Sequence, residues 1–159
     1  MSEANAWLLD LGRGRHAAVG ELEMVHVLPE PPTLFEIPRT PDYCRQVLVW
    51  QGEVLPVMDI AMRLWAQPSE VPRPLGGARD LVAIAAFQQR PGDVPRHGGL
   101  LLRGMPARIV VSDANACELP DSLQAWRPYA LSCFDYSGVG PVPVLNLRGT
   151  FSLAPVKHT

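Results

Sequence analysis

Proline and glycine interrupt this chain so often that they limit its fold more than any other feature of the sequence. The 159 residues include 17 prolines and 13 glycines. Proline breaks the interior of a helix and glycine weakens it, so helices longer than two or three turns have little room. Short apolar runs between these residues have the composition of strands. The chain is therefore predicted to be mainly β, with the size of one domain or of two very small ones that share a core.

Low net charge excludes two large classes of partner. The chain has 14 Lys and Arg residues and 16 Asp and Glu residues, which leaves no basic face to neutralise a nucleic-acid backbone or an anionic membrane. No apolar run approaches the roughly 20 residues needed to span a bilayer. The start, MSEANA, carries an acid but no basic cluster. We therefore expect a cytoplasmic protein with no nucleic-acid partner and no membrane insertion.

The first part of the chain predicts a hairpin, then a helical turn and a short strand. Residues 6–11 and 17–22 are apolar runs around a glycine-containing turn, and residues 22–28 follow them. The sequence GRGRHA at this turn also matches the dinucleotide-binding pattern G-x-G-x-x-A. That pattern requires a helix and a second parallel strand, but Gly20 interrupts the segment. A glycine-rich hairpin turn is therefore the favoured interpretation.

The central stretch VLVWQGEVLPVMDI, residues 47–60, contains two apolar runs joined at a glycine. Pro56 cannot donate a backbone hydrogen bond, so it is compatible only with a strand edge or a bulge. Asp59 has the side chain of a helix N-cap. The stretch predicts strands at residues 47–50 and 54–58, with a turn between them at residues 51–53. A short helix is predicted to follow at residues 60–65.

The second half of the chain predicts further strands after a connection rich in proline and glycine, AQPSEVPRPLGGAR, residues 66–79. The hexapeptide VPVLNL at residues 142–147 matches LPVMDI at residues 55–60 in chemical type at every position, including the proline and the capping Asx. This repeat predicts two small β-barrels, each closed by a strand with an edge proline. The strands of the second half are expected over residues 80–87, 99–103, 107–111, 129–136 and 142–147.

No catalytic or metal-binding constellation emerges from the sequence. The four histidines lack the spacing of metal ligands, and no G-x-S-x-G motif is present. Three widely spaced cysteines without a C-x-x-C pair predict reduced thiols. We expect no enzyme, no cofactor and no metal. The histidines and cysteines concerned are His16, His26, His97, His158, Cys44, Cys117 and Cys133.

The central stretch resembles the signature of CheW-like domains, G-V-h-N-h-R-G-x-h-h-P-h-h-D-L, in which h is apolar. The likeness covers nearly the whole chain. Residues 25–28 are similar to the V-x-E-I segment of the family, and IPRTPDY at residues 37–43 to its lead-in I-P-x-x-P-x-Y/F. In the second half, GLLLRG at residues 99–104 and VLNL at residues 144–147 resemble the segments G-h-h-V-D-x-V and I-L-D-h.

This resemblance implies a single domain over residues 1–159, built from two intertwined five-stranded SH3-like β-barrels with short helices. The first subdomain is expected at about residues 17–80 plus the chain end, and the second at about residues 81–147. The resemblance also implies a non-catalytic adaptor that binds the regulatory domain of a CheA-type histidine kinase and couples it to chemoreceptor tips. Self-association in signalling arrays, or a place at the cell pole, would accompany that function.

The chain departs from the family pattern in segments that the family uses for contacts. Val27 replaces the acid of V-x-E-I, Val49 the asparagine of the signature, and Gln51 the arginine before its glycine. The loss of a bidentate donor and the gain of apolar surface predict a weakened or redirected receptor contact, as in a type IV pilus chemosensory pathway or a polar localisation system. The predicted partner-binding residues are Val25, Val27, Leu28, Trp50 and Gln51.

Two alternatives concern single residues. Trp50 and Trp65 fit core anchors better than interface residues, although tryptophan is enriched at binding hot spots. A small β-barrel that binds an unknown ligand, or that acts as a minor enzyme through Asp59 and His26, is the alternative function. Such a protein requires a deep pocket with convergent polar groups, whereas a shallow apolar groove favours the adaptor.

Overall fold

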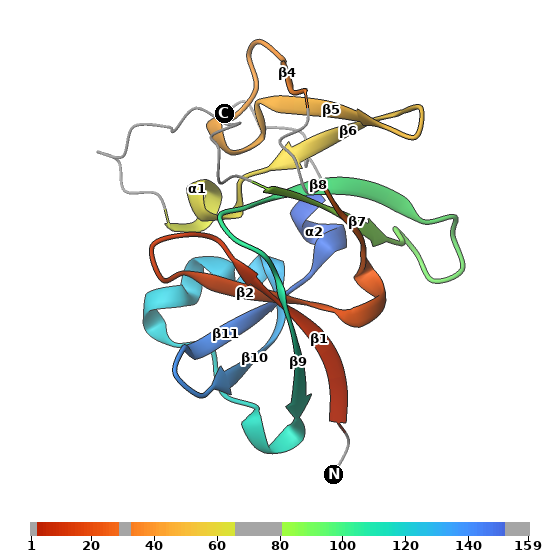
Figure 1. Cartoon of the computed structure of the whole chain (residues 1–159). Helices are drawn as coiled ribbons and strands as arrows, with labels where there is room; N and C mark the ends of the chain where they lie inside the picture. The colour runs from red at the N-terminus through yellow and green to blue at the C-terminus, as the bar shows by residue number, and fades with distance from the viewer. Residues whose placement is uncertain (1–2, 29–32, 66–80, 152–159) are drawn as a thin grey trace.

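The computed structural model of the protein describes residues 3–28, 33–65 and 81–151. Within them the chain forms two curled β-sheets with short helices beside them (Figure 1). The described α-helices, α1 (Ile60–Trp65) and α2 (Leu147–Phe151), span six and five residues, which confirms the mainly β prediction. The connection predicted at residues 66–79, the side chain of Trp65, and His158 lie outside what the structure describes.

The strands are divided between a five-stranded and a six-stranded sheet, which occupy the lower and upper halves of Figure 1. The order in the five-stranded sheet is β10 (Ala130–Tyr136), β11 (Gly140–Leu145), β2 (His16–Gly20), β1 (Glu3–Asp10) and β9 (Ala107–Ser112). The order in the six-stranded sheet is β3 (Met24–Leu28), β7 (Leu81–Phe87), β8 (Arg96–Leu102), β6 (Glu53–Met58), β5 (Gln46–Trp50) and β4 (Phe35–Glu36). The 3-10 segments are η1 (Glu21–Glu23), η2 (Asp42–Cys44), η3 (Asp113–Asn115) and η4 (Asp121–Tyr129).

Each of the two sheets contains strands from both sides of residue 80, where the expected subdomains meet (about residues 17–80 plus the chain end, and about residues 81–147). The chain leaves the five-stranded sheet after β2 and returns to it after β8. β7 therefore pairs with β3, and β8 pairs with β6, across the expected boundary. The larger sheet has six strands because the two-residue strand β4 adds to β5. These pairings are non-local, so no turn or capping signal in the sequence indicates them.

The predicted hairpin at the start of the chain is confirmed. β1 and β2 pair antiparallel, and the turn between them contains Gly12 and Gly14 at φ values of 89° and 74°. A dinucleotide site would need a helix and a parallel strand at this point. Here η1 and then β3 follow β2, as predicted for residues 22–28. The glycines thus serve a tight turn between two strands.

Gln51 and Gly52 join β5 to β6 in a two-residue turn with φ values of 50° and 80°, as a type I′ turn requires. The pair that closes such a turn is hydrogen-bonded, and alternation along the ladder makes Pro56 and Val47 a non-hydrogen-bonded pair. The ladder from β6 to β8 begins at the next residue, Val57. The prediction of a strand edge at Pro56 was wrong, because β6 lies inside the sheet and the proline precedes the second ladder.

The two matching hexapeptides have equivalent surroundings. Pro143 lies in β11, and the parallel pairing of β11 with β2 is recorded at the next residue, Val144. This repeats the relation between Pro56 and Val57 in β6. Both prolines therefore lie in interior strands, just before a parallel ladder. The expectation of closing edge strands was wrong for both copies of the hexapeptide.

Asp59 and Asn146 begin the two α-helices in the same way. The carboxylate of Asp59 and the side-chain oxygen of Asn146 each accept a hydrogen bond from the backbone N–H three residues later, at 3.0 and 3.3 Å. Their own backbone N–H groups donate to the carbonyl oxygens of Tyr43 and Tyr129, at 2.8 and 2.7 Å. The predicted cap and the bounds of α1 are confirmed. α2 was missed, because the last strand was expected to run to residue 147.

One hydrophobic core is shared by the two sheets. Leu9 and Val19 of the five-stranded sheet meet Leu100 and Leu102 of the six-stranded sheet, and η4 adds the fully buried Trp126. We call this cluster the shared core. A second cluster, which we call the inner cluster, lies within the six-stranded sheet and consists of Leu48, Leu55, Val57, Val82, Ile84 and Leu101. A third, within the five-stranded sheet, consists of Ala18, Ile109, Phe134 and Val142.

Arg63 of α1 connects the two halves of the repeat. Its guanidinium donates to the Thr150 carbonyl oxygen at 2.7 Å and to the Tyr129 hydroxyl at 3.0 Å. It also lies over the rings of Tyr43 and Tyr129, 4.6 and 4.3 Å from their centroids. The side chain of Arg63 thus holds α1 and η2 against α2 and η4.

Candidate partner-binding surface

Two valines point to solvent from the β5–β6 hairpin. Val49 and Val54 lie directly opposite each other and are 58% and 66% exposed. Their neighbours Leu48 and Leu55 belong to the inner cluster, because successive side chains of a strand point to opposite faces. The outer face of this hairpin is therefore apolar, where a solvated face of an antiparallel sheet usually carries polar side chains.

The apolar surface continues from the hairpin to β4. Phe35 pairs with Val47, and Val47 pairs with Pro56, so these side chains form one row across three strands. Phe35 is 52% exposed, and the other two are half-buried. Val47 and Val49 are two residues apart on β5 and share a face. We call the set Phe35, Val47, Val49, Val54 and Pro56 the hairpin face.

The tip of the hairpin contains two of the predicted partner-binding residues. Gln51 is exposed in the turn. Trp50 is half-buried against the inner cluster, and its ring centroid lies 5.3 Å from that of His97. Nδ1 of His97 in turn lies 3.7 Å from the carboxylate of Glu53. Trp50 thus anchors the hairpin to β8, in agreement with its interpretation as a core residue, while Gln51 is open to a partner.

The other three predicted residues lie on β3. Val25 is 48% exposed, whereas Val27 packs against the shared core and Leu28 against the inner cluster. In the order of the sheet, β7, β8 and β6 separate β3 from β5. The structure therefore brings Leu28 and Trp50 to one cluster but does not join all five predicted residues in one exposed row. Their contact with a partner stays a prediction.

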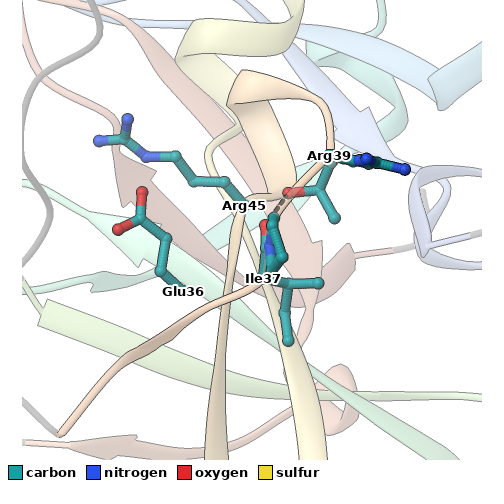
Figure 2. A pocket seen from close by; sticks show the side chains of 6 residues that line it. Glu36, Ile37, Arg39 and Arg45 are labelled. Carbon is teal, nitrogen blue, oxygen red and sulfur yellow. Dashed lines mark hydrogen bonds between the residues drawn. The ribbon is translucent and has the colours of Figure 1, made fainter.

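An open hollow of about 430 Å³ adjoins the β4 end of the hairpin face (Figure 2). Backbone contacts shape it: Ile37 N–H donates to the Arg45 carbonyl oxygen and Thr40 Oγ1 to the Ile37 carbonyl oxygen, both at 2.8 Å. In Figure 2 the side chains of Glu36 and Arg45 extend to one side and that of Arg39 to the other. Charged side chains thus surround an open hollow beside the hairpin face, and this hollow is not enclosed as a ligand pocket would be.

Asp59 and His26, which the alternative function requires, have separate surroundings. Asp59 is only 8% exposed, and its carboxylate caps α1 and lies 3.5 Å from the guanidinium of Arg103. His26 is exposed on β3. Asp59 therefore has a structural role as cap and ion-pair partner, and the hollow beside the hairpin face is lined by neither Asp59 nor His26.

Sequence reasoning missed Phe35, Val54 and the charged side chains around the hollow as candidate contacts. Val49 was singled out only as a departure from the family pattern. The signal that could have found the valine pair is the alternation of Leu48, Val49, Leu55 and Val54 about a two-residue turn, which puts both valines on one face. Phe35 had no such signal, because its pairing with β5 follows a loop without periodicity.

Among residues 3–28, 33–65 and 81–151, no three His, Cys, Asp or Glu side chains gather as metal ligands would. In the same ranges, no helix has both the length and the apolar composition that crossing a membrane requires.

Comparisons with known proteins give one family and a structural neighbour. The family model of the CheW-like domain matches residues 8–91. The crystal structure of scaffolding protein TtCheW from Thermoanaerobacter tengcongensis is similar to this chain, with a TM-score of 0.71 and 12% sequence identity. The likeness covers 96% of this chain and 94% of that one, which confirms the expected fold. No curated protein matches the sequence significantly.

Proposed function

The chain belongs to the CheW-like domain family, and from this premise we propose that it is a non-catalytic adaptor for a CheA-type histidine kinase. In this proposal it binds the regulatory domain of the kinase and couples it to chemoreceptors, within cytoplasmic arrays or at the cell pole. Self-association with further copies of the chain would extend such an array. The family is one of chemotaxis scaffold proteins, which supports the adaptor class over an enzyme.

The hairpin face is the observation that carries the proposal. Exposed apolar side chains gathered on a regular hairpin mark surfaces that bind other proteins. Protein interfaces combine a desolvated apolar centre with a polar rim, and here Glu36, Arg39 and Arg45 lie beside the apolar row. The rigid type I′ turn and the anchoring of Trp50 hold this surface in one conformation, which lowers the entropic cost of binding.

In this proposal the five sequence-predicted residues, two at the hairpin and three on β3, have two roles. We assign direct contact to Gln51 and Val25, whose side chains are exposed. Trp50 and Leu28 pack against the inner cluster behind the hairpin, and Val27 packs against the shared core, so these three have supporting roles. The centre of the contact is then the pair Val49 and Val54.

The receptor contact is redirected in this proposal. Arginine before the turn glycine would present a planar, bidentate donor, and Gln51 cannot replace its charge. Val49, two residues before Gln51, adds apolar surface and is 58% exposed. An apolar tip selects a different partner face from a charged one. This change supports an adaptor with its own receptor or localisation partner, such as one of a type IV pilus chemosensory pathway.

Calorimetric titration with the regulatory domains of the CheA-type kinases of the same cell tests the proposal. We expect saturable one-to-one binding, and Val49→Asp should weaken it at least tenfold, because a carboxylate would be buried without a partner at the interface. Tenfold corresponds to about 1.4 kcal/mol. Trp50→Ala is a poorer probe, because Trp50 also packs against the inner cluster.

Val110→Asp is the matched control for this titration. Val110 lies on β9 in the other sheet and is 57% exposed. The Val110→Asp variant should therefore bind the kinase domain as tightly as the wild-type protein does. If both aspartate variants bind with the same affinity, the hairpin face is excluded as the binding surface, while the adaptor function remains. No binding of the folded wild-type protein to any of the kinases would exclude the adaptor itself.

A further inference from the structure

Cys117 and Cys133 lie against each other at the edge of the five-stranded sheet. Ala116 forms a bridge with Phe134 of β10, and the Cys117 N–H donates to the Cys133 carbonyl oxygen at 3.0 Å. The same antiparallel register places the two cysteines opposite each other. Their sulfur atoms are 3.4 Å apart, and both cysteines are thiols. This contact has no part in the proposed adaptor surface.

The backbone here has the separation that a disulfide needs. Residues opposite each other in an antiparallel pair have Cα atoms about 4.5–5.5 Å apart. Disulfides span about 4.4–6.8 Å between Cα atoms, so no strand has to move. The sulfur atoms need to approach by about 1.4 Å to reach bonding distance, which small side-chain rotations can supply.

The segment that carries Cys117 leads from one edge of the five-stranded sheet to the other. β9 is one edge strand of the five-stranded sheet and β10 is the other. The chain leaves β9 at Ser112, passes through η3 and reaches β10 at the bridge of Ala116 with Phe134. A covalent link at the next residue would fasten this crossing segment to the opposite edge.

We propose that Cys117 and Cys133 are an oxidation site that forms a reversible intramolecular disulfide with hydroperoxides. The Cys117 thiol releases its proton to solvent, and the thiolate attacks the peroxide and breaks its O–O bond. The sulfur takes the hydroxyl group as a sulfenic acid, and the departing alkoxide or hydroxide takes up a proton from solvent to leave as an alcohol or water. The Cys133 thiol then displaces hydroxide from that sulfur, and its proton completes one water molecule. Two thiols are oxidised, one peroxide is reduced, and a dithiol reverses the bond by exchange.

The order of these steps follows from the surroundings of each sulfur. Cys117 is half-exposed, so a small peroxide can reach it, whereas Cys133 is only 5% exposed. Burial first, and then the neighbouring Cys117, raise the pKa of Cys133 to about 12. Cys133 is therefore a thiol at neutral pH and acts second. Burial also raises the pKa of Cys44, whose residue is 7% exposed, so Cys44 should stay reduced.

Peptide mapping by mass spectrometry tests the site. The full-length protein is treated with hydrogen peroxide, unfolded, and alkylated with iodoacetamide. We expect a cross-linked pair of peptides that contain Cys117 and Cys133, with a mass lower by two hydrogens than that of the two separate peptides. Cys44 should be alkylated. Dithiothreitol should restore three alkylated cysteines. Sulfinic acids in place of the cross-link, a link between two chains, or three alkylated cysteines after peroxide would overturn the proposal.

Thermal unfolding tests whether the link fastens the sheet. A bond that closes a loop of 16 residues should raise Tm by roughly 6–12 °C in the oxidised protein. Cys117→Ser should fold and show no such rise after peroxide, because Cys117 is half-exposed and tolerates a hydroxyl. A cross-link without a rise in Tm would show that the bond does not fasten the crossing segment to β10.

Discussion

The guanidinium of Arg63 lies between the rings of Tyr43 and Tyr129, which occupy equivalent places in the two halves of the repeat. Arg63 follows the cap Asp59 by four residues, and Thr150 follows the cap Asn146 by four. Arg63 donates to the Thr150 carbonyl oxygen. The two halves thus meet at matching positions, and of these two residues Arg63 has the long side chain that donates hydrogen bonds. The contact between the two halves is therefore asymmetric: the guanidinium of Arg63 makes it from one half, and the backbone of Thr150 receives it in the other.

Arg63→Ala should lower the free energy of unfolding by about 2–4 kcal/mol, because it removes two charge-assisted hydrogen bonds and two contacts with aromatic rings. Arg63→Lys should lie between the alanine variant and the wild type, since it keeps the charge but not the planar fork. Urea unfolding measures both. Arg148→Ala removes one exposed hydrogen bond and should cost less than about 0.5 kcal/mol. An Arg63→Ala variant as stable as Arg148→Ala would show that Arg63 does not hold the two halves together.

At the scale of elements, the missed helix α2 connects the end of the five-stranded sheet to the β7–β8 hairpin. Phe151 at its end is 8% exposed and stacks on Phe87, with ring centroids 5.2 Å apart and planes at 6°. Gly98 of β8 makes room for it, because a Cβ at this position would lie 2.3 Å from the Phe151 ring. The glycine is needed for this close approach, and not for a turn.

Gly98→Ala should cost about 1–3 kcal/mol of stability, because the added methyl overpacks the contact with Phe151. Adding Phe151→Leu should recover part of that loss, since the smaller side chain leaves room for the methyl group. Urea unfolding of the two single variants and the double variant gives the coupling between the positions. Strictly additive effects would show that the two residues do not compete for the same space.

At the scale of the whole molecule, the shared core makes the two sheets depend on each other. Leu9 and Val19 lose their packing if the six-stranded sheet opens, and Leu100 and Leu102 lose theirs if the five-stranded sheet opens. The chain also crosses between the sheets twice, after β2 and after β8. Neither sheet is formed by one continuous segment, so we expect one cooperative unit.

Hydrogen exchange at increasing urea should report one unfolding free energy for the slowest amides of β2 and of β8. The reason is that both strands contribute to one core, so global unfolding exposes them together. Amides at the exposed tip around Gln51 should exchange faster and serve as an internal reference for local opening. Two distinct free energies for β2 and β8 would show that the sheets unfold separately.

Local chemistry could be predicted from the sequence, because neighbours along the chain decide it. The turn at Gln51 and Gly52 needs only a residue pair that accepts positive φ, and Asp59 needs only a free helix end. The same rule would have indicated α2 from Asn146. The family resemblance also led to the right fold. Pro56 misled, because a missing donor excludes one ladder position and does not identify an edge.

Tertiary structure alone decided the surfaces and the long-range contacts. Phe35 joins the hairpin face only through its pairing with Val47, and Val27 packs against the shared core. Arg63 donates to Tyr129 and Thr150, which lie 66 and 87 residues away along the chain. Cys117 meets Cys133 only because the segment after β9 reaches β10. Turns and caps depend on a few adjacent residues, so the sequence by itself determined them. Strand partners and exposed faces depend on which distant segments bury the same core, and this only the folded chain decided.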